Sequence, residues 1–144
     1  MHTRFRQISL FVLLSIMLPA CSHRSAPDLQ TAEQRVAQYN ALLAEANRAA
    51  AAAAISLQHS GTLTAGQTGE VLAWSERIAG ACKLVAQQLR SEDPWTTRAV
   101  QIRAVFEQIA PPGWKDRYTE YKPLADAIQN TVSLVQLIAR EVQS

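Results

Sequence analysis

The sequence predicts an all-α fold, an antiparallel up-down four-helix bundle that follows a cleaved signal peptide. Two observations predict the bundle. Apolar residues recur at spacings of three and four in four separate segments after residue 30, and this is the period of amphipathic helices. Capping residues, glycines and prolines separate the segments, and no segment alternates apolar and polar residues for long enough to make a strand. Because the connections are short, consecutive helices should run antiparallel.

The first predicted helix covers residues 31–59. Thr31, with Gln34 three residues later, forms a capping box. The alanine run over residues 49–54 has the highest helix propensity available and lets another backbone approach closely. It therefore indicates either tight packing inside the bundle or a docking site for a partner helix. The predicted buried stripe comprises Val36, Tyr39, Leu43, Ala46, Ala50, Ala53 and Leu57.

The second helix is expected after a tight turn. Gly61 is placed as the C-terminal cap of the first helix, and Thr64 with Gln67 forms a second capping box. Cys82 lies within the apolar pattern of this helix, so we expect a buried thiol that packs as a small hydrophobe. A reactive or intermolecular thiol is the alternative. The predicted buried stripe comprises Val71, Trp74, Ile78, Ala81, Val85 and Leu89.

Prolines bound the third predicted helix. Asp93 before Pro94 indicates an N-cap followed by proline at the first helical position. The helix should end near Ile109, because the two prolines of segment 111–113 cannot continue it. The predicted buried stripe comprises Ala99, Ile102, Phe106 and Ile109.

The fourth predicted helix has two possible starts. Pro123 could lie in its first turn, after a separate short turn over residues 114–121. Alternatively, the helix could begin near Lys115 and kink at Pro123. The predicted buried stripe comprises Leu124, Ile128, Thr131, Val135, Ile138 and Val142.

A different pattern precedes the helices. Residues 1–7 are basic through Arg4 and Arg6, and residues 8–18 form an apolar run interrupted only by two serines. This run is well short of the roughly 20 residues that a membrane-spanning helix requires. Its layout is that of a secretory signal.

Residues 18–21 are Leu-Pro-Ala-Cys and resemble the lipobox of bacterial lipoproteins, in which a peptidase cuts before the cysteine and the thiol carries a diacylglycerol. The resemblance is confined to the N-terminal segment. It implies that residues 1–20 are a signal peptide and that residues 21–28 are the lipidated Cys21 and a tether. From the periodic pattern we expect residues 29–144 to be the helical bundle domain. Secretion with a free N-terminus and an uncleaved anchor are the alternatives.

The resemblance also implies a membrane partner and a location. Among lipoproteins of double-membraned bacteria, an aspartate after the lipidated cysteine commonly signals retention in the inner membrane, and Ser22 stands there instead. We therefore expect a lipid anchor on Cys21 in the outer membrane, with the domain facing the periplasm. With the Cys21 thiol acylated, Cys82 has no disulfide partner.

The charged and reactive residues favour binding over catalysis. Of 14 basic residues only Arg4 and Arg6 precede Cys21, so 14 − 2 = 12 remain against 12 acidic residues. This neutral balance argues against a nucleic-acid partner. After Cys21 the histidines are His23 and His59 alone, too few for a zinc site or a histidine-dependent mechanism. We expect no catalytic residues, no metal, no cofactor and no enzymatic activity.

Residues 114–122 form a cluster whose composition differs from the rest of the chain. Interleaved aromatic and cationic side chains suit a membrane interface, a glycan surface or a protein hot spot. The alternative is that the three aromatic residues, at spacings of four and three, cap one end of the bundle core. The candidate interface residues are Trp114, Lys115, Arg117, Tyr118, Tyr121 and Lys122.

These observations favour a lipid-anchored cell-envelope protein that acts as a binding or scaffolding module for an envelope protein or a glycan. A second hypothesis is a carrier of a small apolar ligand, in a bundle cavity lined by Trp74, Phe106 and nearby aliphatic residues. An accessory or phage-derived lipoprotein also fits the small size and low motif content. An enzyme using Asp116 or Glu120 has weak support, because carboxylates four residues apart are ordinary on a solvated helix face.

Overall fold

The computed structural model describes residues 31–143, and over these residues the fold is all-helical with no strand. The predicted fold class is confirmed at this level: four α-helices are packed together around one core. They are α1 (Ala32–His59), α2 (Ala65–Leu89), α3 (Trp95–Glu107) and α4 (Lys122–Glu141), with a short 3₁₀ helix η1 (Lys115–Tyr118) before α4. The signal-peptide segment, Cys21 and the tether lie outside the described residues.

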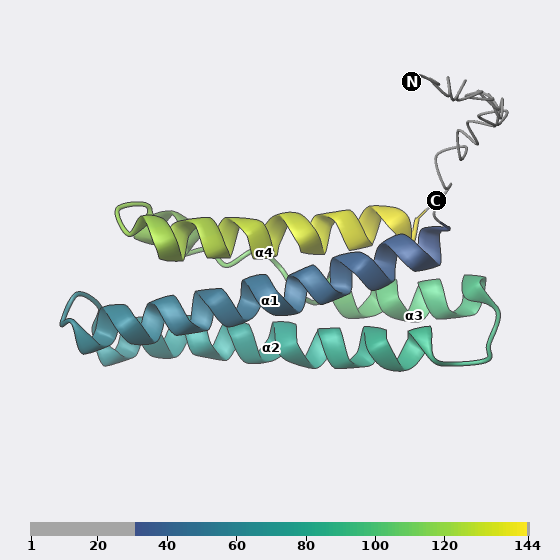
Figure 1. Ribbon diagram of the computed structural model, residues 1–144, viewed down its shortest axis with the longest axis horizontal. Coiled ribbons are helices and arrows are strands. Elements are labelled where there is room, and N and C mark those ends of the chain that lie inside the picture. Colours follow the sequence, from purple (N-terminus) through teal and green to yellow (C-terminus); the bar gives the residue numbers. More distant parts are fainter. Residues whose placement is uncertain (1–30, 144) are drawn as a thin grey trace, which may run out of the picture.

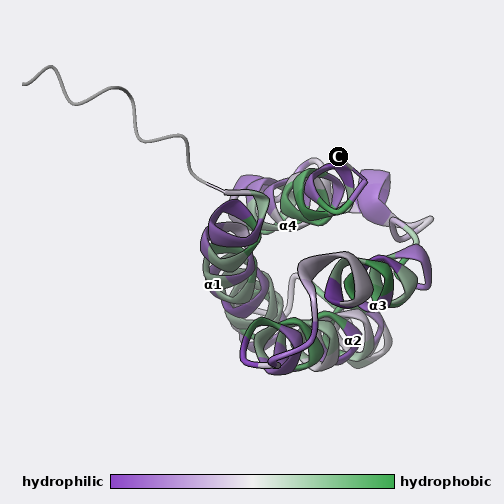
Figure 2. Ribbon diagram, turned by 90° about the vertical axis from the view of Figure 1, so that its right-hand side faces the viewer, coloured by the Kyte–Doolittle hydropathy of each residue, from purple (hydrophilic) through white to green (hydrophobic). Residues whose placement is uncertain are grey.

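Helix α1 is the central element of the bundle. It packs along both α2 and α4, and these are the two most extensive helix pairings. Figure 1 shows α1 between the other two, with α3 alongside part of α2. Seen along the bundle, the four helices surround a common interior (Figure 2). Because α3 is the shortest helix, it covers only part of α4.

The ends of α1 and the start of α2 are set by the predicted local chemistry. The backbone N–H of Gln34 donates to Thr31 Oγ1 at 3.2 Å, and the N–H of Thr31 donates to Gln34 Oε1 at 2.9 Å. Thr64 and Gln67 repeat this capping box with distances of 3.2 and 2.9 Å. Gly61, with φ 75°, follows α1 in the left-handed conformation that glycine adopts without steric cost.

The predicted start of α3 is wrong by one residue. Pro94 is the N-cap and has no side-chain capping bond. The carboxylate of Asp93 instead accepts a hydrogen bond from the Ser91 hydroxyl at 2.9 Å, and the Asp93 N–H donates back to that oxygen at 3.2 Å. Because this local turn occupies the carboxylate, Asp93 does not cap the helix.

Helix α3 also ends before Ile109, the expected last residue. An α-helix bonds each N–H to the carbonyl four residues earlier. The prolines at positions 111 and 112 have no N–H for the carbonyls of Glu107 and Gln108, and α3 accordingly ends at Glu107. For α4 the structure adopts the first of the two predicted starts, with Pro123 in the first turn and η1 as a separate element.

The buried face of α1 differs from the predicted stripe. Val36, Leu43 and Ala50 are fully buried, as predicted. The other predicted positions, Tyr39, Ala46, Ala53 and Leu57, are only partly buried. The residues that share the buried face are Asn40, Asn47 and Ala54.

The two buried asparagines explain this difference. The side-chain amide of Asn40 donates to the Cys82 carbonyl at 3.1 Å, and that of Asn47 donates to the Ser75 carbonyl at 3.0 Å. Donors and acceptors are both seven residues apart, so the same contact recurs after two helical turns. Because a buried amide without a partner is costly, this repeated bond favours one register of α1 on α2.

A partly buried ion pair joins three helix ends. The Arg98 guanidinium on α3 donates to both carboxylate oxygens of Glu33 on α1, at 2.7 and 3.0 Å, and to the Gln88 carbonyl at the end of α2, at 3.3 Å. The Arg98 side chain also lies over the Trp95 ring. The hydrogen bond from Arg98, reinforced by its charge and opposed by burial, holds the pKa of Glu33 below its ordinary value of 4.5.

This pair predicts an acid-sensitive contribution to stability. Because the pKa of Glu33 is lower in the folded chain, the contribution is full above the ordinary value of 4.5 and is lost as the pH falls through the folded pKa. Glu33→Gln should therefore flatten the fall in unfolding free energy below pH 4.5, measured by denaturant titration at several pH values. Arg98→Gln should flatten it too, because it removes the cause of the shift. An unchanged acid limb in both variants would contradict this assignment.

Candidate functional site

The structure divides the residues of the 114–122 cluster between core and surface. Tyr118 is 1% exposed, and Trp114 and Tyr121 pack partly buried against the core. The cationic residues Lys115, Arg117 and Lys122 are exposed. The aromatic side chains therefore close the interior, and only the cations present a large surface to a partner.

Two of the exposed cations make surface ion pairs. Lys122 Nζ lies 2.7 Å from Asp126 Oδ2, one turn along α4. Arg117 reaches across to Glu70 on α2 at 3.6 Å. Such exposed pairs add little stability. Asp116 and Glu120, the weak catalytic candidates, are also exposed and do not converge with a nucleophile or histidine among the described residues.

The buried aromatic residues form a chain of edge-to-face contacts. Trp114 lies 5.4 Å from Tyr118, ring centroid to ring centroid, at an interplanar angle of 72°. Trp114 also lies 5.9 Å from Trp74 of α2, at 83°. Both geometries are favourable for aromatic pairs. The segment around η1 thus holds Trp74 in a fixed orientation at the end of this chain.

Trp74 forms part of the wall of a cavity between α3 and α4, which we call the α3–α4 cavity. Its volume is about 300 Å³. Trp74 and Phe106, the two residues named for a ligand cavity from the sequence, both line it. The full lining is Trp74, Phe106, Glu107, Ile109, Ala110, Pro111, Val132, Val135, Gln136 and Ala139.

The early end of α3 creates this cavity. After Glu107 the chain leaves the helical path and runs through Ala110 and Pro111 over the interior. No helical turn of α3 then covers the middle of α4, where Val132 and Val135 line the opening. The inner wall is buried at Trp74, Phe106 and Val132, while Glu107, Pro111 and Gln136 are exposed at the mouth.

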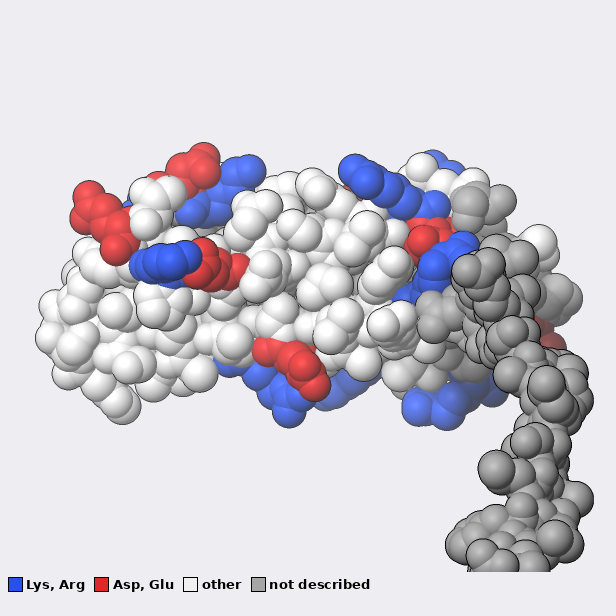
Figure 3. Space-filling model, turned by 45° about the horizontal axis from the view of Figure 1, so that its top comes forward, with Lys and Arg blue, Asp and Glu red and all other residues white. Residues whose placement is uncertain are grey.

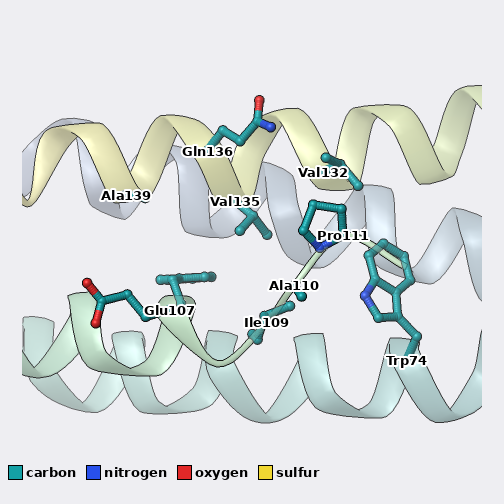
Figure 4. A pocket seen from close by; sticks show the side chains of 10 residues that line it. Trp74, Glu107, Ile109, Ala110, Pro111, Val132, Val135, Gln136 and Ala139 are labelled. Atoms are coloured by element: carbon teal, nitrogen blue, oxygen red, sulfur yellow. The ribbon is translucent and has the colours of Figure 1, made fainter. Parts of the chain in front are cut away.

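One polar atom of the inner wall has no partner. The Trp74 side chain is 2% exposed, and its indole Nε1–H makes no hydrogen bond within the described part of the chain. Figure 4 shows the nitrogen edge of the indole on the side that faces Ala110 and Pro111. A buried donor left unsatisfied costs about 1–3 kcal/mol. The cavity therefore combines apolar walls with one unpartnered donor that is buried within the wall.

Sequence reasoning found part of this site and missed the rest. The periodic stripes gave Trp74, Phe106, Ile109 and Val135 as interior residues. Val132, Gln136 and Ala139 were missed, although their spacings of four and three place them on one face of α4. Ala110 and Pro111 were considered only as helix terminators, and nothing in the sequence alone places them over a cavity.

Cys82 is a buried free thiol, as predicted. Burial raises its pKa to about 11 from an ordinary 9. At pH 8 this two-unit shift leaves about a hundredfold less thiolate, the reactive form. In a Cys21→Ser variant, where Cys82 is the only thiol, we expect a disulfide reagent such as DTNB to react at least a hundredfold more slowly with native than with denatured protein. Equal rates would contradict the buried assignment.

The described residues contain neither a metal-ligand cluster nor a membrane-spanning helix. No group of three or more potential metal ligands occurs among residues 31–143, and His59 is exposed at the end of α1. None of the four α-helices has both the length and the apolar character needed to cross a bilayer.

The fold and the site define a helical bundle with a preformed apolar cavity. Comparison with known proteins found no matching family model, no matching curated protein and no matching solved structure.

Proposed function

We propose that the chain is a lipid-anchored binding module of the cell envelope, and that it binds a small apolar ligand in the α3–α4 cavity without catalysing a reaction. The observation that carries the proposal is the cavity itself, with its apolar inner wall and its volume of about 300 Å³. Small-molecule sites are typically concave, mostly apolar and largely preformed, with volumes from about 300 Å³ upward.

The anchor in this proposal is Cys21. A lipobox cysteine followed by Ser22 supports attachment to the outer membrane, with the bundle facing the periplasm. The seven residues 22–28 reach at most about 25 Å when extended, so the bundle would stay close to the bilayer. Two or more acyl chains give stable membrane association where one gives only marginal binding.

The finer arrangement of the helices is also part of the proposal. We place α1 to α4 in an up-down antiparallel order. The connection between α1 and α2 and the connection between α2 and α3 span only a few residues, and such short links favour antiparallel neighbours. In this order α3 and α4 are neighbours, and the end of α3 and the middle of α4 line the same cavity.

A fluorescent apolar probe tests the binding site. The full chain with Cys21→Ser should bind 1-aminonaphthalene at a single site, measured by fluorescence titration. Ala139→Phe puts a phenyl ring into the cavity lining and should weaken binding at least tenfold. Val135→Phe fills the cavity from a neighbouring lining position and should weaken binding in the same way. The test then does not depend on correct folding of Ala139→Phe alone.

Ala125→Phe is the matched control. Ala125 is also a partly buried alanine of α4, but it lies 14 residues before Ala139 and outside the cavity lining. It should bind the probe as the parent does. The proposal fails if both cavity-filling variants remain folded by circular dichroism and bind the probe with parental affinity.

A second candidate function is scaffolding through a shallow groove between α1 and α4. Leu42 is 43% exposed on its rim, and small residues of α1 leave room for a docked helix. Figure 3 shows charged side chains toward the ends and edge of this face, with an uncharged stretch between them. The groove, which we call the α1–α4 groove, is lined by Leu42, Glu45, Ala46, Ala49, Asn130, Ser133, Leu134 and Leu137.

The occupant that this groove fits is an apolar helix of an envelope protein. Its lining has a single charged side chain, Glu45, and small residues let helices approach closely. Ala46→Arg should then abolish recovery of that partner after crosslinking in the envelope, while probe binding in the α3–α4 cavity stays unchanged. The scaffold hypothesis fails if the recovered proteins are the same with and without the substitution.

A further inference from the structure

We propose that the α3–α4 cavity takes a neutral, largely apolar molecule of about ten non-hydrogen atoms that carries one hydrogen-bond acceptor, and that the Trp74 Nε1–H donates to that acceptor. This inference rests on the binding function proposed above. Ketones, esters and amides with a short aliphatic chain have this chemistry. The size follows from about 300 Å³ of space, at roughly 30 Å³ for each water-sized group.

The polarity of the ligand follows from the cavity wall. Trp74 is fixed by its contact with Trp114, which in turn contacts Tyr118, so its donor is held in one direction. The two other polar side chains of the lining, Glu107 and Gln136, point outward in Figure 4. The Trp74 Nε1 atom itself is covered in this structure, so an acceptor reaches the indole N–H once the segment at Ala110 and Pro111 shifts, and the rest of the molecule meets aliphatic and aromatic carbon.

The charge of the ligand follows from the mouth. Glu107 is the one ionisable residue among those that line the cavity, and it already lies 2.7 Å from Arg103 on α3. A carboxylate ligand would find no cation in the lining, and its charge would stay unpaired against apolar walls. An ammonium ligand would have to share a carboxylate that Arg103 occupies. A neutral ligand avoids both penalties.

Three probes of equal size separate these requirements. Decane, 2-nonanone and octanoate each have about ten non-hydrogen atoms, matching the room in the cavity. The first has no acceptor, the second has one neutral acceptor and the third is charged. We expect 2-nonanone and decane to bind, and octanoate to bind at least tenfold more weakly than 2-nonanone.

The indole resonance of Trp74 reports the hydrogen bond directly. In ¹H–¹⁵N spectra of the full chain with Cys21→Ser, assigned with Trp74→Phe, the Trp74 Nε1–H proton should move downfield with 2-nonanone and should lack this downfield shift with decane. In Trp74→Phe the preference for 2-nonanone over decane should fall by about fivefold to tenfold, the usual value of one neutral hydrogen bond. Trp74→Phe also changes the size of the cavity, but this change affects both ligands. The ratio of their two affinities therefore removes its effect.

The outcomes separate this inference from the function on which it rests. If decane and 2-nonanone bind and the Trp74 resonance does not respond to the ketone, the acceptor assignment is wrong and the binding function stands. If octanoate binds as tightly as 2-nonanone, the neutral-ligand assignment is wrong. If none of the three binds, and 1-aminonaphthalene also fails to bind, the binding function itself is overturned.

Discussion

Tyr118→Ala is expected to destabilise the fold by about 3–5 kcal/mol, the usual cost of removing a buried aromatic side chain. Tyr118 is among the largest fully buried side chains, 1% exposed, and its ring supports Trp114. Its loss should also free Trp74 to move, so probe binding in the α3–α4 cavity should weaken in the molecules that remain folded. Denaturant unfolding followed by circular dichroism measures the first effect, and fluorescence titration measures the second.

Tyr118→Phe is the control, because it keeps the aromatic ring and removes only the hydroxyl. The hydroxyl oxygen is buried and has no hydrogen-bond partner within residues 31–143, and burial raises the pKa of the phenol. Removing the hydroxyl therefore should leave stability unchanged or increase it slightly. A loss as large as that of Tyr118→Ala would mean that the hydroxyl makes an important bond, which would contradict the packing assigned to this residue.

Cys21→Ser is expected to transfer the protein almost completely from the membrane fraction to the soluble fraction. In the proposed anchor a thioether at position 21 carries the diacylglycerol, and a serine hydroxyl cannot form it. Without acyl chains the bundle would have no stable hold on the bilayer. Immunoblots of fractionated cells measure the distribution.

Cys82→Ser is the matched control, because it removes the other thiol of the chain. Cys82 is a buried residue of α2, so its replacement should leave the fractionation unchanged. If Cys21→Ser remains in the membrane fraction, another segment or a partner holds the protein there, and the proposed anchor is wrong.

Local chemistry made most helix boundaries predictable. A threonine followed three residues later by glutamine determined the starts of α1 and α2, because each capping box is complete within four residues. The same kind of reasoning failed at Asp93. Its carboxylate had two local bonding options, helix capping and the turn with Ser91, and sequence alone does not rank them.

The register of α1 could not be predicted from apolar periodicity. Asn40 and Asn47 are polar, so a hydrophobic pattern assigns them to the surface. They are buried because carbonyl groups of α2, at Ser75 and Cys82, lie within hydrogen-bond distance. That partnership depends on the packing of two helices, and no single segment contains it.

The candidate site could be predicted from the sequence only in part. Trp74 and Phe106 are large apolar residues on predicted stripes, so a cavity between them was a reasonable hypothesis. The other walls depend on where α3 ends and on how the prolines at 111 and 112 direct the chain. The aromatic members of the 114–122 cluster were harder to assign, because spacings of three and four fit an exposed face and a buried one equally well.

The most direct test of the account is a native mass spectrum of the protein extracted from envelopes in mild detergent, recorded for the wild type and for Ala139→Phe. For the wild type we expect the mass of residues 21–144 with covalently attached acyl groups, together with a small non-covalent adduct. In Ala139→Phe the acylated chain should remain and the adduct should disappear. A chain that retains residues 1–20 without acylation would contradict the anchor, and an adduct that is absent from the wild type or survives Ala139→Phe would contradict binding in the α3–α4 cavity.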